Sequence, residues 1–250
     1  MKGRILATLF VAALVFSAGY AALFIAPEEA TMGLIQRIFY FHVAAWASMF
    51  TAFYIAVFAN IAYLISRRQK WDWLGVSAVE VGVMCCTIGL VTGPIWAHPV
   101  WGVWWTWDAR LVTTFILWLL YISYLLLRGL VDEPQRRAML SAVFGIFAFL
   151  DVPLVYVSNR LWRTTHPQPV ILGGANSGLD PTMAKVLGFC ICAILGVTIL
   201  ILINRYRLEK LRHDYEELRF AVESRDDVES REEVESRLTD AQSNPTKANI

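Results

Sequence analysis

Four tryptophans fall within seven residues of the chain, a density that suggests a binding surface for a flat ligand. They are Trp101, Trp104, Trp105 and Trp107, in the sequence WGVWWTWDARL of residues 101–111. At a membrane interface a tryptophan keeps its apolar ring and its single N–H donor in a half-wet environment, which accounts for one or two tryptophans per loop. Four so close together favour a shelf of aromatic faces, with interface anchoring as the alternative.

Two histidines elsewhere in the chain have the chemistry of metal ligands. His42 lies in the sequence RIFYFHV of residues 37–43, and His166 lies in LWRTTHP of residues 161–167. A lone histidine at an interface is usually a hydrogen-bonded surface residue. Two neutral imidazoles, however, can take both axial positions of a haem iron. The tryptophan shelf would then hold the porphyrin.

Charged residues near these groups could bind the propionate groups of a haem. Arg37, Arg110 and Arg163 are candidates to pair with the haem propionates, because arginine pairs well with carboxylates. Asp108, beside Arg110, is explained more simply as half of an ion pair that fixes the loop than as a catalytic acid. We find no nucleophile and no acid–base pair, so we expect that the protein is not an enzyme.

The composition indicates that a membrane domain positions these residues. Of the 250 residues, 57% are hydrophobic and 17% are charged, whereas soluble domains have about 45–50% and about 25%. Of the 43 charged side chains, 21 lie in residues 205–250. Residues 1–204 therefore lack the charge density of a water-soluble surface. We predict a polytopic membrane domain over 1–204 and a charged tail over 205–250.

The charge and cysteine distributions exclude several other classes of function. The net charge is +1 and neither region is a basic block, so we expect no nucleic-acid partner. The four cysteines lie in apolar stretches and form no CxxC or CxxCH motif. This argues against a disulfide framework, a redox dithiol and covalent attachment of haem.

Six apolar segments are long enough to cross a bilayer core of about 30 Å, which takes about 20 helical residues. We therefore predict an all-α fold with six transmembrane helices. The segments cover approximately residues 5–26, 42–65, 74–93, 111–127, 138–157 and 182–203. The first resembles a signal peptide at its basic start, but its apolar run continues to Ala26, and we expect a retained membrane anchor.

The basic residues that flank the six segments predict the orientation of the domain. If the N-terminus is cytoplasmic, that side holds twelve Lys and Arg residues and the other side holds five. This bias agrees with the positive-inside rule, so we place both termini in the cytoplasm. The outer face then carries the functional loops, at residues 27–41, 94–110 and 158–181.

Two carboxylates lie inside predicted membrane segments, Glu80 in the third and Asp151 in the fifth. Ionisable groups are costly in lipid and are functional candidates by default. Hydrogen bonding within the helix bundle explains them equally well, so we assign them no site.

The tail begins as a continuation of the last transmembrane helix. Its apolar residues recur every three or four positions, at Leu208, Leu211, Tyr215, Leu218 and Val222, as in the seam of a coiled coil. The seam lasts barely two heptads, which favours a solvated amphipathic extension over self-association. We expect the Glu-, Arg- and Ser-rich sequence that follows to be disordered.

The segments around the tryptophans and histidines resemble a known protein family. Residues 101–111 are similar to the WWD signature of haem-handling proteins, which include CcmC and CcmF of bacterial cytochrome c maturation and CcsA of the other assembly system. Residues 37–43 and 162–166 resemble the two histidine blocks of CcmC. Six spans with both termini inside also match CcmC. The resemblance covers about residues 1–204.

The resemblance implies a site and a function. In CcmC-type proteins two outer histidines are axial ligands of the haem iron, which implies these roles for His42 and His166. The WWD segment forms the haem platform, which implies the set Trp101, Gly102, Trp104, Trp105, Trp107 and Asp108. The implied function is to bind haem b, non-covalently and transiently, at the outer face of the bacterial inner membrane. The haem then passes to the chaperone CcmE, with CcmA, CcmB and CcmD as further partners.

Other functions remain open. A CcsA-type delivery protein would handle haem similarly with other partners, although CcsA proteins carry further histidines inside the membrane. A b-type cytochrome subunit that transfers electrons would need histidines on facing spans, and this chain has none in mid-span. A small-solute transporter would show inverted repeats with broken spans, and none is visible.

Overall fold

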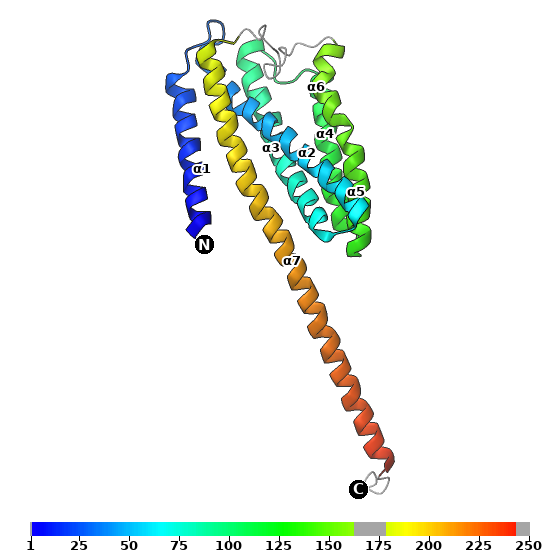
Figure 1. The fold of residues 1–250 in the computed structure, drawn as a ribbon. Coiled ribbons are helices and arrows are strands. Elements are labelled where there is room, and N and C mark those ends of the chain that lie inside the picture. Colours follow the sequence, from blue (N-terminus) through cyan, green and yellow to red (C-terminus); the bar gives the residue numbers. More distant parts are fainter. Residues whose placement is uncertain (1, 163–178, 244–250) are drawn as a thin grey trace. The chain divides into compact units, whose positions relative to one another are not determined.

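The computed structural model describes residues 2–162 and 179–243, and the regular elements within those ranges are all helical (Figure 1). In chain order they are α1 (Lys2–Tyr20), the π-helical turn η1 (Ala21–Ile25), the 3-10 turn η2 (Leu34–Arg37), α2 (Ile38–Ser66), α3 (Gln69–Trp101), α4 (Ala109–Leu130), α5 (Pro134–Phe149), α6 (Asp151–Leu161) and α7 (Pro181–Ser243). Six helical segments in these ranges are long and apolar enough to cross a membrane. The prediction of an all-α fold with six spans is therefore confirmed.

The chain divides into two compact units, Met1–Tyr206 and Arg207–Ile250. Within the first unit successive spans alternate in direction (Figure 1). The starts of α2 and α4 therefore lie at the same end of this unit as the ends of α3 and α6. We call this end the histidine end, because His42 lies near the start of α2.

The core of the first unit is formed where α2, α3 and α4 pack together. Phe53 of α2 stacks on Tyr121 of α4, with ring centroids 3.8 Å apart. Gly82 and Gly89 of α3 face the rings of Phe53 and Trp46, and a methyl group at either glycine would collide with those rings. Small residues let membrane helices approach closely, and here they admit aromatic rings from α2.

Helix α3 is longer than the sequence predicts. The predicted outer loop begins at residue 94, but α3 continues through Pro94 and Pro99 and ends at Trp101. A proline inside a helix removes one backbone hydrogen bond, which membrane proteins tolerate where neighbouring groups compensate. The helix stops at Gly102, whose φ of 72° is left-handed and whose N–H donates to the His98 carbonyl at 2.8 Å. The loop before α4 is therefore only residues 102–108.

A short turn precedes the 3-10 turn that leads into α2. The backbone N–H groups of Met32 and Thr31 donate to the Glu29 carboxylate at 2.5 Å and 2.8 Å. These hydrogen bonds stabilise the ionised carboxylate and so lower the pKa of Glu29, and the bond from Met32 has the largest effect. The turn closes at Gly33, whose N–H donates to the Glu29 carbonyl.

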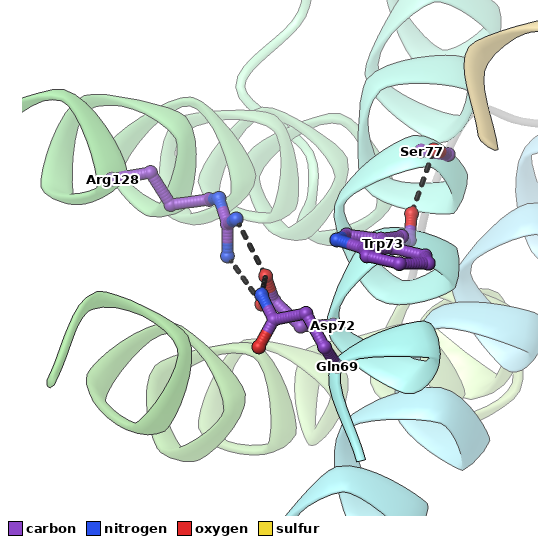
Figure 2. Close-up of polar contacts among 5 residues, drawn as sticks. All are labelled: Gln69, Asp72, Trp73, Ser77 and Arg128. Carbon is purple, nitrogen blue, oxygen red and sulfur yellow. Dashed lines mark hydrogen bonds and ion pairs between the residues drawn. The ribbon is translucent and has the colours of Figure 1, made fainter. Parts of the chain in front are cut away.

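At the opposite end of the unit a buried ion pair joins α3 to α4 (Figure 2). Both guanidinium Nη atoms of Arg128 donate to the Asp72 carboxylate, at 2.6 Å and 2.9 Å. The two side chains are only 11% and 6% exposed. Gln69 adds a third hydrogen bond to Asp72 at 3.3 Å. The carboxylate is thus well satisfied, which a buried charge requires.

Glu80, one of the two carboxylates inside the spans, has a cationic partner. Arg205 of α7 donates from Nε and Nη2 to its two carboxylate oxygens, at 2.5 Å and 2.7 Å. This fork gives the Glu80 carboxylate two hydrogen bonds from a charged partner inside the membrane domain. It also links α3 to α7.

The last helix extends further than the sequence predicts. The apolar seam ends at Val222, yet α7 continues as far as Ser243. Ion pairs four residues apart stabilise its charged part, such as Arg212 with Glu216 and Arg219 with Glu223. Residues 223–243, which follow the seam and were expected to be disordered, are therefore helical in the structure.

Candidate functional site

An apolar cavity of about 300 Å³ lies at the histidine end, between the last turns of α3 and the loop that follows. Its lining comprises Gly93, Pro94, Ala97, Trp101, Val103, Trp104, Trp105, Thr106 and Leu111. The volume is at the lower end of the range for small-molecule sites. A large flat ligand would therefore lie partly inside the cavity and partly against the indoles around it.

The structure brings three of the four clustered tryptophans to this cavity. Trp101, Trp104 and Trp105 line it, whereas Trp107 does not. Trp104 and Trp107 are 59% and 76% exposed. Such exposed indoles beside an apolar cavity form a surface that a hydrophobic ligand or partner would cover.

The ends of the tryptophan loop are fixed by Gly102 and Asp108. Gly102 terminates α3 in a left-handed conformation that a residue with a side chain rarely adopts. Asp108 caps α4, since its carboxylate accepts from the Leu111 N–H at 3.0 Å and from the Thr106 hydroxyl at 3.2 Å. Neither residue lines the cavity. In this structure both shape the loop that carries the tryptophans.

His42 lies next to the cavity. Gly93, which lines the cavity, is so close to the His42 ring that a methyl group on it would lie 3.4 Å from Cε1. The ring centroid of Trp96 is 5.8 Å from that of His42 and 6.3 Å from that of Trp101. Aromatic rings in contact thus extend from His42 through Trp96 to Trp101, which lines the cavity.

Both ring nitrogens of His42 take part in hydrogen bonds. Nδ1 lies 2.8 Å from the Thr92 hydroxyl of α3. Nε2 accepts a hydrogen bond of 2.8 Å from the indole N–H of Trp46, one turn further along α2. The imidazole is therefore held in one orientation between the two helices.

Two of the three arginines predicted to contact propionates lie within the described residues, and they are placed differently. Arg110 lies at the start of α4, where its guanidinium Nη1 donates to the Asn159 side-chain oxygen of α6 at 2.9 Å, with the amide of Asn159 oriented as its neighbours require. This bond holds α4 against α6. Arg37 lies five residues before His42, and its buried Nε has no hydrogen-bond partner among residues 2–162 and 179–243. Of the two, Arg37 is better suited to receive an anionic group.

His166 and Arg163 lie outside the described residues. The structure therefore places one of the two histidines predicted as axial ligands, and it leaves the position of the second as a prediction.

Several residues of this site were not singled out in the sequence. They are Trp46, Thr92, Gly93 and Trp96. The ring of His98 also lies at this site, stacked on Trp104 with centroids 4.1 Å apart. One signal was present, because His42 and Trp46 are four residues apart and so share a helix face. The contacts across to α3 have no such signal, since they depend on how two distant segments pack.

The chain was also compared with known proteins. It matches the model of the heme exporter protein C family over residues 1–221. It is 29% identical to the heme exporter protein C of Bradyrhizobium diazoefficiens over 202 residues, which are 80% of this chain and 76% of that protein. It is 30% identical to that of Haemophilus influenzae over 76% of this chain and 77% of that protein. With that of Escherichia coli K12 the identity is 28%, over 77% and 80% of the two chains.

The family match confirms the resemblance carried by the tryptophan and histidine segments, and it extends past residue 204 into the charged tail. This chain belongs to the heme exporter protein C family.

Proposed function

We propose that the chain binds haem b non-covalently at the histidine end, with His42 and His166 as axial ligands of the iron. One observation carries this proposal: His42 lies against Gly93, the same residue that lines the tryptophan cavity. A coordinating imidazole is thus within reach of an apolar surface suited to a porphyrin. Three relatives in three bacteria are named heme exporters, which supports the same ligand.

The residues at this end fit haem. The indoles of Trp101, Trp104 and Trp105 offer apolar faces for the porphyrin, and the imidazole of His42 offers nitrogen to the iron. Arg37, with its unpaired buried Nε among the described residues, would hold a propionate. Bound haem supplies the Lewis-acid iron, and the protein supplies ligands and an apolar surface.

The chain acts in this proposal as a carrier and not as an enzyme. Haem has to be held firmly and still be released, so two ligands from separate segments are suitable. Loss of the bond to one histidine weakens binding without dismantling the tryptophan loop, whose shape depends on Gly102 and Asp108.

The proposed setting is the bacterial inner membrane, with both termini in the cytoplasm and the histidine end on the outer face. The excess of basic residues at the other end of the spans supports this orientation. The proposed recipient is a CcmE-like haem chaperone. Subunits like CcmA, CcmB and CcmD are the proposed partners within the membrane complex.

A transfer assay tests this function. The purified haem-loaded protein is mixed with the soluble domain of a CcmE-like chaperone, the two are separated, and haem on each is measured. We expect haem to move to the chaperone, and we expect His42→Ala to load and deliver much less. His213→Ala is the control, because His213 pairs with Glu217 in the tail helix. Failure of the wild-type protein to deliver haem would contradict the proposed handover.

A further inference from the structure

The hydrogen bonds around His42 determine which of its nitrogens is free of a proton. The indole N–H of Trp46 can only donate, so Nε2, which it contacts at 2.8 Å, carries a lone pair. The Thr92 hydroxyl donates to the Ile88 carbonyl at 2.7 Å, so it accepts from Nδ1 at 2.8 Å. Both hydrogen bonds therefore fit a neutral imidazole that carries its proton on Nδ1.

This tautomer is the one that ligation through Nε2 requires. A metal-bound histidine commonly donates its other N–H to an oxygen acceptor, which fixes the ring and makes the ligating nitrogen a stronger donor. Thr92 already provides that acceptor. The single lone pair of Nε2, however, is held by Trp46, and it cannot bind iron and accept the indole proton together.

The packing of α2 against α3 holds both partners in place. A methyl group at Gly89 would come within 2.5 Å of the Trp46 ring, so this glycine makes room for the indole. Gly93, one turn further along α3, lies beside the His42 ring, and a methyl group there would be in ordinary van der Waals contact with it, 3.4 Å from Cε1. The hydrogen bonds of His42 are thus part of the interface between α2 and α3.

We propose that Trp46 and Thr92 control the ligation of haem by His42. Thr92 is a positioning residue that keeps Nε2 as the ligating nitrogen. Trp46 competes with iron for Nε2, so it lowers haem affinity and recaptures the imidazole when haem leaves. This inference rests on the proposed function, and it adds a reason why a carrier releases its cargo.

The first test uses the haem-free protein. The protein is labelled with nitrogen-15 histidine and its ring nitrogens are observed by NMR in detergent, with His42→Ala to assign the signals. We expect His42 to be protonated at Nδ1 only, and we expect the Nε2 signal to move in Trp46→Phe. Protonation at Nε2 in the wild type would overturn the inference.

The second test measures the rate at which haem is lost to an excess of apomyoglobin. We expect Trp46→Phe to slow the loss, on the order of 5-fold, which is the effect of one ordinary hydrogen bond. We expect Thr92→Val to speed the loss by about 10-fold and to raise the haem midpoint potential, because the imidazole becomes a weaker donor. The potential separates a positioning role from a merely structural one.

The chain offers matched controls for both substitutions. Trp118 of α4 donates its indole N–H to the Thr87 hydroxyl of α3 at 2.9 Å. Trp118→Phe and Thr87→Val remove the same chemical groups, and we expect them to leave the haem loss rate unchanged.

The outcomes separate the two proposals. If His42→Ala retains haem like the wild type, the proposed ligand and this inference both fail. If His42→Ala loses haem but Trp46→Phe and Thr92→Val lose it at the wild-type rate, the inference alone fails.

Discussion

Gly102 shows how backbone geometry alone can select a residue type in the tryptophan loop. Its φ of 72° ends α3 and turns the chain back toward the cavity. A side chain in this conformation costs about 1–2 kcal/mol. We therefore expect Gly102→Ala to lower the free energy of unfolding by about that amount, measured by thermal denaturation in detergent.

Gly129→Ala is the control for this change, since Gly129 lies within α4 and an added methyl group would meet nothing. Alanine favours a helix more than glycine does, so we expect this variant to be at least as stable as the wild type. Equal effects of the two substitutions would contradict the role of Gly102.

Trp105 and Trp107 lie two residues apart in the motif but differ in their surroundings. Trp105 lines the cavity, while Trp107 is 76% exposed and lies outside the lining. We expect Trp105→Ala to reduce co-purified haem strongly and Trp107→Ala to reduce it little, measured as haem per protein. A larger loss in Trp107→Ala would mean that the exposed face, and not the cavity, is the haem platform.

The sequence could single out a candidate site because its unusual residues are dense and chemically distinctive. The clustered tryptophans and His42 at the edge of a span can be seen without the fold, and the structure places His42 next to the cavity that three of these tryptophans line. The roles of Trp46 and Thr92 were not predictable, since they follow from contacts between α2 and α3. Gly102 and Asp108 were assigned to the platform by resemblance, and their backbone roles became visible only in the fold.

At the scale of elements, one buried ion pair contributes to the contact between α3 and α4. Asp72 and Arg128 form two hydrogen bonds at the end of the unit opposite the histidine end (Figure 2). Removal of one partner leaves an uncompensated buried charge, which costs about 3–5 kcal/mol. We expect Asp72→Ala to destabilise the protein by an amount of this order in thermal unfolding.

Replacement of both partners by apolar residues should be far less harmful, because no charge is then left unpaired. We expect Asp72→Leu with Arg128→Met to recover most of the stability lost in Asp72→Ala. If the double variant is as unstable as the single one, the pair is needed for more than charge compensation.

Hydropathy predicted all six spans, but it did not predict where α3 ends. The number of spans follows from the length of apolar sequence needed to cross a bilayer. The end of α3 is set instead by the left-handed turn at Gly102, and the helix passes two prolines that argue against it in the sequence. This difference moves His98 from a loop to a helix, where its ring stacks on Trp104.

At the scale of the whole molecule, the proposed haem site and the tail lie in different units. The cavity and His42 belong to Met1–Tyr206, and the second unit begins at Arg207. The family match ends at residue 221, within α7. We expect a protein truncated after Glu223 to retain haem at the wild-type level, measured as haem per protein. Loss of haem on truncation would assign the tail a part in the site.

The most direct measurement is the absorption spectrum of the purified protein, expressed with sufficient haem, beside those of His42→Ala and His166→Ala. Two histidine ligands predict a six-coordinate haem b spectrum in the wild type. Each single variant is expected to lose the haem or to show a five-coordinate spectrum. A wild type without haem, or a His42→Ala spectrum identical to that of the wild type, would contradict the account.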